Sequence, residues 1–245
     1  METTTLPQVK QAKGERLMTY QVTLCGSDGV VVASDRCEAW QEETGGISRN
    51  RVNKLLLDKL SQTAWTFSGG HFSGITARYL RDALEQSPTN DEAAILEMLK
   101  ESGNKAFRNF ASPPKARVTD IVVLVFGKSQ RIVRAHPSTE TLLEDLEDKC
   151  VSGETDSLVN YFPEHFYSRN MCVRELASLA GYAVRMAHEL DPKYVDGLDL
   201  AIYQNSTGRF QFADRDTCWH GAAKLDDALR QFIKAQALSM PFSQP

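Results

Sequence analysis

The segment from Tyr20 to Ala33 constrains the fold more than any other part of the chain. Apolar and polar residues alternate over Tyr20–Leu24, which is the pattern of a strand with one buried face. The sequence Gly-Ser-Asp-Gly follows at residues 26–29 and is a strong signal for a tight turn. Because Val30–Ala33 is then an apolar, β-branched run, the segment predicts an antiparallel hairpin near the start of the folded region.

Strand-like and helix-like segments follow in blocks. Further strands are predicted at Val52–Leu57, Thr63–Phe67, Ile121–Phe126, Gln130–Arg134, Leu158–Phe162, Leu198–Tyr203 and Arg209–Phe212. Helices are predicted from apolar faces within Ile75–Leu84, Ile95–Phe110, Val173–Ala187 and Leu225–Ile233. The acidic segment Thr141–Glu147 is expected to be a short helix or a loop insertion. Since strands and helices do not alternate singly, the order predicts an α+β fold with stacked antiparallel sheets and helices outside them.

Composition narrows the class of protein. The 245 residues include 28 Lys and Arg and 32 Asp and Glu, and the net charge of −4 argues against a surface that coats nucleic acid. No apolar run approaches the roughly 20 residues that span a bilayer, and the first residues lack the apolar core of a secretory signal. Five scattered cysteines without a CxxC pair indicate reduced thiols. We therefore expect a cytoplasmic protein that binds neither nucleic acid nor membranes.

Motifs for metals and cofactors are not found in the sequence. The five histidines form no HxxxH or HExxH unit, and neither GxGxxG nor a GxxxxGK[ST] phosphate loop occurs. We expect no metal and no cofactor.

Four positions are expected to meet at one end of the hairpin. Asp35 ends the hairpin 16 residues after Thr19, and an antiparallel hairpin of that length brings its two ends together. Lys54 opens the next apolar run and could direct its ammonium to the same point. The turn Ser68–Gly70 is flexible, and one of its N–H groups could face that point too. A lone threonine at the start of a strand would be no more than a β-favourable residue, so the grouping is what indicates chemistry.

These residues carry a resemblance to a known family. The segment from Thr19 to Gly70 resembles the catalytic half of a proteasome β-type subunit, within the N-terminal-nucleophile hydrolases. The residues that carry the resemblance are Thr19, Asp28–Arg36, Val52–Lys54 and Ser68–Gly70. The interval to Lys54 needs a few inserted residues, which we place in the loop Glu42–Gly46. The second half is a weaker match, and the N-terminal helix signature of α-type subunits is absent. The resemblance implies one domain over residues 19–245, a four-layer αββα sandwich of two antiparallel sheets flanked by helices.

The resemblance also implies roles for individual residues. Thr19 would be the mature N-terminus, with its hydroxyl as nucleophile and its own α-amine, of pKa ~7.7–8.0, as general base. The positive charge of Lys54 would lower the pKa of that amine, and Asp35 would hold Lys54 charged and oriented. The Gly70 N–H would stabilise the oxyanion. Asp191 is the retained acidic residue of the family's supporting group.

Residues 1–18 would be an N-terminal tail or pro-segment that must be removed to free Thr19. Either the chain cleaves itself between Met18 and Thr19, or translation begins at Met18 and that methionine is trimmed. The sequence departs from the family at two supporting serines: one falls at Gly153 or Glu154, and the other at Tyr194. Ser152 or Ser157 could take the first place only with a shift of the alignment.

The function implied is that of a threonine-type endopeptidase in a self-compartmentalised complex. Its substrate would be a peptide or an unfolded protein. It would assemble into a homo-oligomeric ring, and an ATPase is a possible partner. Two alternatives stay open: a catalytically silent ring or scaffold subunit of the same fold, and an N-terminal-nucleophile amidohydrolase acting on a small amide.

Overall fold

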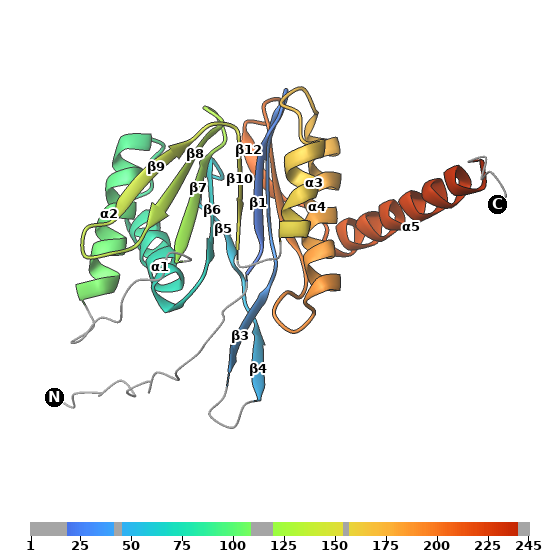
Figure 1. Ribbon diagram of the computed structural model, residues 1–245. Coiled ribbons are helices and arrows are strands. Elements are labelled where there is room, and N and C mark those ends of the chain that lie inside the picture. Colours follow the sequence, from blue (N-terminus) through green and yellow to red (C-terminus); the bar gives the residue numbers. More distant parts are fainter. Residues whose placement is uncertain (1–18, 42–45, 109–119, 154–156, 240–245) are drawn as a thin grey trace.

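The computed structural model describes residues 19–41, 46–108, 120–153 and 157–239, so the predicted tail or pro-segment 1–18 lies outside it (Figure 1). The strands are β1 (Gln21–Cys25), β2 (Gly29–Ser34), β3 (Cys37–Gln41), β4 (Ile47–Arg51), β5 (Leu55–Leu57), β6 (Thr63–Ser68), β7 (Ile121–Phe126), β8 (Arg131–His136), β9 (Leu142–Leu146), β10 (Lys149–Ser152), β11 (Asp199–Gln204) and β12 (Arg209–Phe212). The helices are α1 (His71–Gln86), α2 (Glu92–Arg108), α3 (Ser157–Phe166), α4 (Val173–Leu190) and α5 (Arg215–Ser239).

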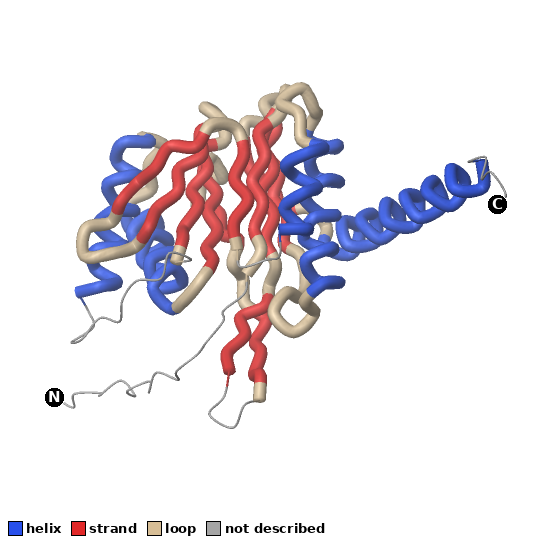
Figure 2. Tube along the Cα trace, viewed as in Figure 1, coloured by secondary structure: helices blue, strands red, loops and turns tan. Residues whose placement is uncertain are grey.

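Two five-stranded sheets form the centre of the molecule (Figure 2). The first sheet has the order β10-β1-β2-β11-β12, and the second has the order β5-β6-β7-β8-β9. Every strand pairing in both sheets is antiparallel. The remaining pair, β3 and β4, forms a separate two-stranded ribbon. The expectation of an α+β fold with antiparallel sheets is confirmed.

The space between the two sheets is filled by one apolar cluster. Val30 and Val32 of β2 lie in the same buried cluster as Val123 and Val125 of β7. Because side chains alternate across a strand, the other residues of these strands point to the outer faces. The hairpin β1–β2 therefore has both faces buried, whereas the sequence predicted a strand with only one buried face.

Helices cover both outer faces. Val22 and Leu24 of β1 pack with Leu176 of α4 in one buried cluster, and Trp65 of β6 packs with Leu80 of α1 in another. Figure 1 shows α3 and α4 beside the first sheet and α1 and α2 beside the second. The helix α5 begins against α4 and then projects away from the rest of the described chain (Figure 1).

Two predicted elements are wrong. The segment Thr141–Glu147 contains the strand β9, whose acidic side chains form ion pairs with basic ones of β8, Arg131 with Asp145 and Arg134 with Glu144. An edge strand of this kind shows no apolar alternation. The segment Leu158–Phe162 belongs to the helix α3: its apolar residues are spaced three apart, which suits a helix as well as a short strand.

Candidate active site

Thr19, Asp35 and Lys54 come together between the two sheets. Thr19 directly precedes Tyr20 and β1, Asp35 follows β2, and Lys54 precedes β5, so the two sheets supply different members of the group. Their residues are only 4%, 0% and 2% exposed, respectively. The Lys54 Nζ lies 2.7 Å from the Thr19 Oγ1 and 3.0–3.1 Å from the two Asp35 carboxylate oxygens.

The Asp35 carboxylate accepts hydrogen bonds from Lys54 and from two backbone N–H groups. Besides Lys54, it accepts the backbone N–H of Tyr20 at 2.9 Å and that of Cys37 at 2.8 Å. Burial raises the pKa of Asp35, while the Lys54 charge and the hydrogen bonds oppose that rise. A carboxylate this deep is stable only when it is paired and hydrogen-bonded, and its contacts hold the Lys54 side chain in position.

The arrangement suits activation of the Thr19 hydroxyl. An ammonium that donates to the hydroxyl oxygen holds it in one orientation, and it stabilises negative charge that develops there when the proton leaves. The β-branched Thr19 side chain also has a restricted χ1, so few orientations compete.

The backbone N–H of Gly70 already has a hydrogen-bond acceptor in this structure. Gly70 is the N-cap residue of α1, and its N–H donates to the Asp120 Oδ1. A Cβ at Gly70 would lie 2.8 Å from that same oxygen, so the carboxylate fits closely against the glycine. In this conformation the N–H expected to stabilise an oxyanion is not available to one. The sequence analysis did not single out Asp120, which lies just before β7 and is 3% exposed.

Asp191 lies at the end of α4, where it is the C-cap residue. Its backbone oxygen accepts the N–H groups of Tyr194 and Val195. Over the described ranges, no hydrogen bond or ion pair joins its carboxylate to Thr19 or Lys54. The structure therefore does not bring Asp191 into the group.

Gly153 packs directly against Thr19. It has a φ of +132°, and a Cβ built on it would lie 1.7 Å from the Thr19 carbonyl oxygen. One of the two missing family serines was expected at this position or at Glu154, which lies outside the described residues. This position requires glycine, because a residue with a Cβ could not approach the Thr19 backbone so closely.

A buried polar network lies next to these residues and was missed by the sequence analysis. The Gln21 Nε2 donates to the Ser68 Oγ at 3.1 Å and to the Ser152 Oγ at 2.5 Å. The signal that could have found it is a glutamine two residues after Thr19, since alternate residues of a strand share a face.

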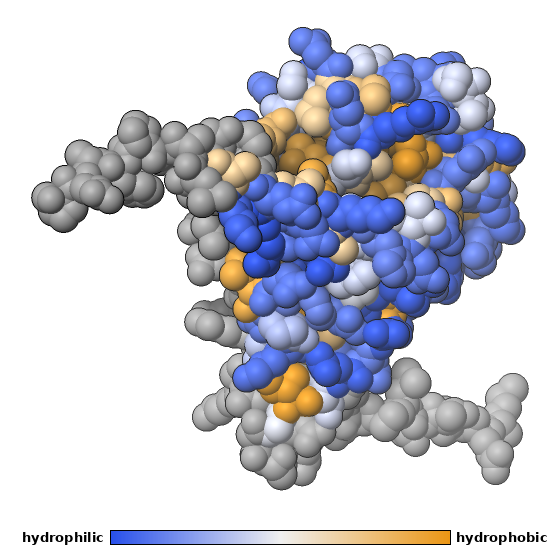
Figure 3. Space-filling view, turned by 90° about the vertical axis from the view of Figure 1, so that its right-hand side faces the viewer, coloured by the Kyte–Doolittle hydropathy of each residue, from blue (hydrophilic) through white to orange (hydrophobic). Residues whose placement is uncertain are grey.

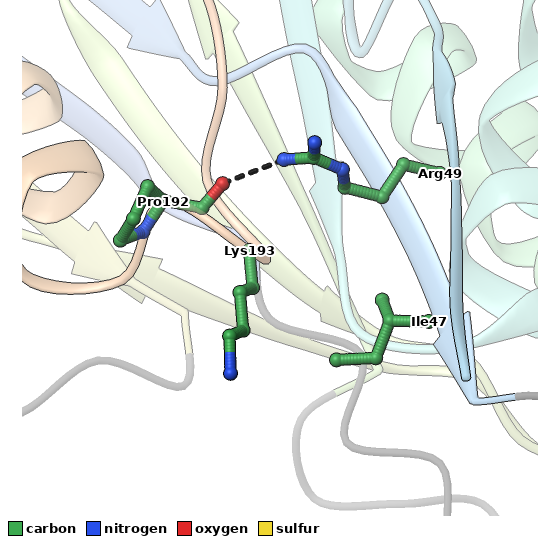
Figure 4. Close-up of a pocket in the computed structure, with 4 residues that line it drawn as sticks. All are labelled: Ile47, Arg49, Pro192 and Lys193. Atoms are coloured by element: carbon green, nitrogen blue, oxygen red, sulfur yellow. Dashed lines mark hydrogen bonds between the residues drawn. The ribbon is translucent and has the colours of Figure 1, made fainter. Parts of the chain in front are cut away.

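A separate groove lies between the β3–β4 ribbon and the segment after α4. It is lined by Ile47, Arg49, Pro192 and Lys193 and has a volume of about 490 Å³ (Figure 4). Arg49 donates to the Pro192 carbonyl oxygen at 2.7 Å across it (Figure 4). Neither Thr19 nor Lys54 lines this groove.

Two features are absent from the part of the chain that the structure describes. Its histidines, cysteines and acidic residues form no group of three that could hold a metal ion. None of its helices combines the length and the apolar character that crossing a membrane requires.

The fold is shared with solved structures of Anbu proteins. Anbu (ancestral beta-subunit) from Yersinia bercovieri aligns with a TM-score of 0.67 at 14% identity, covering 92% of this chain and 99% of that one. Anbu from Hyphomicrobium sp. strain MC1 aligns with a TM-score of 0.65 at 15% identity over 92% of this chain and 100% of that one. A Gly-1 mutant of that protein gives 0.67 at 15% identity over 93% and 100%. No protein-family model and no curated protein sequence matches the chain.

These findings correct the family that the sequence indicated. The three structures compared above are Anbu proteins, so the assignment to proteasome β-type subunits is wrong. The resemblance rested on short local motifs, and such motifs do not separate families that share a fold. Identities of 14–15% show the fold alone.

Proposed function

We propose that this chain is an Anbu-like hydrolase of the N-terminal-nucleophile class that cleaves peptide bonds through an ester on Thr19. The observation that supports it is the buried contact from Asp35 through Lys54 to the Thr19 hydroxyl, at 3.0 Å and 2.7 Å. Part of the proposal is that residues 19–245 form one four-layer αββα domain and that residues 1–18 are removed. The two sheets and the helices on their outer faces support that arrangement.

The first half of the reaction forms the ester. The free α-amine of Thr19 takes the proton of its own hydroxyl, and the oxygen attacks the carbonyl carbon of the substrate. Lys54 stabilises the negative charge on the attacking oxygen and, as a nearby cation, favours the neutral amine that can accept a proton. The amine then gives its proton to the leaving nitrogen as the amide C–N bond breaks.

The second half releases the acid. Water gives a proton to the same amine and attacks the ester carbonyl carbon, and the Thr19 oxygen leaves and regains its proton. Each step passes through an oxyanion that needs a donor. The Gly70 N–H is a candidate, and it becomes available when the Asp120 carboxylate moves away from it.

We also propose that the protein works as an oligomer, in the form of a ring. The support is the shared fold with a protein described as an ancestral beta-subunit. Exposed apolar side chains also favour contacts between copies: Tyr161 and Phe166 of α3 are 46% and 59% exposed, and Leu225 of α5 is 42% exposed. Figure 3 shows apolar side chains gathered in the upper part of a face that is otherwise mostly hydrophilic.

A silent scaffold subunit is the second candidate, and two observations favour it. The Gly70 N–H is occupied by Asp120, and Asp191 does not contact Thr19 or Lys54. A scaffold would keep Thr19 joined to the preceding residues, with no free amine to act as base.

Intact-mass measurement of the purified protein, with Thr19→Ala as the matched variant, separates these candidates. The hydrolase predicts a wild-type mass that begins at Thr19 and gains one equivalent of a peptidyl β-lactone, which the threonine hydroxyl opens to an ester. The Thr19→Ala protein should gain none. A wild-type protein that keeps residues before Thr19 and takes up no β-lactone would establish the scaffold.

The same preparation tests the substrate class. Light scattering gives the oligomeric state, and hydrolysis of peptides is compared with that of small amides. A monomer or dimer that is active only on small amides would replace the endopeptidase with a small-amide hydrolase.

A further inference from the structure

We propose that Gln21 is a positioning residue for Thr19, tying the segment that packs against the nucleophile to the turn that ends in Gly70, across the two sheets. The inference deepens the proposed function and rests on it. The hydrogen bonds that join Thr19, Lys54 and Asp35 do not involve the Gln21 side chain.

The Gln21 amide joins three segments of chain. Gln21 lies in β1, Ser152 ends β10 beside it in the first sheet, and Ser68 ends β6 in the second sheet. The Cα of Gln21 pairs with that of Ser152. The two hydrogen bonds from its Nε2, at 3.1 Å to Ser68 and 2.5 Å to Ser152, therefore include one within a sheet and one between sheets.

Ser152 leads directly into a residue that packs against Thr19, and Ser68 leads into the turn that holds the proposed oxyanion donor. Ser152 precedes Gly153, whose backbone packs against the Thr19 carbonyl oxygen. Ser68 precedes the turn that ends in Gly70, the N-cap of α1. A shift of Ser152 would move a neighbour of the nucleophile, and a shift of Ser68 would move the turn that holds the proposed oxyanion donor, so one amide links both segments.

The side chain of Gln21 also shares a face of its strand with Thr19. Residues two apart on a strand point to the same side, so Gln21 is the next inward-facing residue after the nucleophile. The following inward positions, Thr23 and Cys25, carry smaller side chains, and Cys25 lies in the apolar cluster between the sheets. The polar bridge is thus confined to the end of the strand where Thr19 lies.

Packing alone does not account for a glutamine at this position. Gln21 is 1% exposed, and its Oε1 is buried without a hydrogen-bond donor among the described residues. A buried amide with an unsatisfied oxygen lowers stability, whereas an apolar residue of similar shape would not. A side chain kept despite that disadvantage is explained by what its Nε2 holds in place.

The test measures how fast a peptidyl β-lactone acylates Thr19 in the full-length protein after its N-terminus is freed. Intact mass follows the reaction, and its dependence on β-lactone concentration separates the maximal rate constant from the apparent dissociation constant. For Gln21→Met we expect the maximal rate constant to fall about 10–100-fold, the range that follows from a misplacement of about 1 Å. The apparent dissociation constant should stay within about twofold, since no group that binds the β-lactone has been removed.

Thr23→Val is the matched control, because it is a buried substitution on the same face of the same strand, two residues farther from Thr19. Its maximal rate constant should equal that of the wild type. Ser152→Ala is the second variant in case Gln21→Met does not fold, and it should lower the maximal rate constant in the same direction. If the two act as a unit, the double variant should be no slower than Gln21→Met alone.

The outcomes separate the two proposals. If the wild type is acylated at Thr19 but Gln21→Met and Ser152→Ala match Thr23→Val, Gln21 is not a positioning residue and the proposed function stands. If the freed wild type is not acylated at all, both proposals fall together. A slower Gln21→Met with an unchanged apparent dissociation constant supports both.

Discussion

Gly153 approaches the backbone of Thr19 so closely that a Cβ built on it would lie 1.7 Å from the Thr19 carbonyl oxygen. Its φ of +132° is also one that side-chain-bearing residues rarely adopt. The place of the nucleophile is therefore defined partly by a residue that has no side chain.

Gly153→Ala should displace Thr19 from Lys54. We expect the free energy of unfolding to drop by roughly 1–3 kcal/mol through backbone strain, and the rate of Thr19 acylation to fall by at least tenfold. Chemical denaturation and the β-lactone mass assay measure the two effects.

The control is Gly221→Ala, in the helix α5, where an added Cβ would meet nothing within 4 Å. Alanine is favoured over glycine inside a helix, so this variant should be more stable than the wild type by about 0.5–1 kcal/mol. If Gly153→Ala proved as stable as Gly221→Ala, the close packing of Gly153 against Thr19 would be contradicted.

Lys54→Met should slow the acylation of Thr19 strongly and also destabilise the fold. The variant leaves Asp35, which is 0% exposed, without its counter-charge. Removing one partner of a buried ion pair typically costs about 3–5 kcal/mol. We expect acylation of Thr19 to slow by about 10²–10⁴-fold, measured on protein that thermal unfolding shows to be folded.

Adding Asp35→Asn to Lys54→Met should recover part of the lost stability, because no charge then remains buried. The rate of acylation should not recover. A double variant less stable than the sum of the two single effects would show that the pair is held together by something other than charge.

The pH dependence of stability should show the raised pKa of Asp35. Its ordinary value is 3.8, and burial raises it in the folded protein. The native state then binds the Asp35 proton more tightly than the unfolded chain does, so this group's contribution is complete below the unfolded pKa and is lost as pH rises through the folded pKa. The free energy of unfolding of the wild type, relative to that of Asp35→Asn, should therefore decrease from about pH 3 to pH 7. A relative increase over that range would mean that Lys54 and the backbone donors lower the pKa of Asp35.

Asp120 is expected to restrain the reaction in the conformation observed. Its carboxylate accepts the Gly70 N–H. If that N–H serves the oxyanion, Asp120→Ala should raise the rate of Thr19 acylation in protein that remains folded, by up to the 10²–10³-fold that one oxyanion donor contributes. Asp82→Ala, at a half-exposed site on α1, is a control for removal of a carboxylate. A rate in Asp120→Ala equal to or below that of the wild type would assign the oxyanion to another donor.

Much of the fold followed from the sequence because its signals are local. The strand Ile121–Phe126 and the strand Arg209–Phe212 have the bounds that their apolar runs and turn residues predicted. The expectation that Thr19 and Asp35 would meet came from the length of a hairpin, and that for Lys54 from its place at the start of the next apolar run. The three lie in contact, although Lys54 leads into a strand of the other sheet.

What the sequence could not predict depends on contacts between distant segments. The acidic strand β9 pairs with β8, whose Arg131 and Arg134 face its acidic side chains, and its own residues do not show that. The pairing of Gly70 with Asp120 joins residues 50 positions apart, and Gln21 with Ser152 joins residues 131 apart. The ribbon of β3 and β4 was missed because Ile47–Arg51 is mostly exposed and lacks apolar alternation.

Because the two sheets supply different members of the reactive group, Thr19 can become reactive only after both sheets have formed. Thr19 and Asp35 lie next to the ends of two strands of one sheet, and Lys54 lies just before the edge strand β5 of the other. A newly synthesised chain that has built only one layer holds an ordinary alcohol with no cation to activate it. Under the proposed function, hydrolytic activity would therefore arise only late in folding, and incompletely folded copies nearby would not be cleaved.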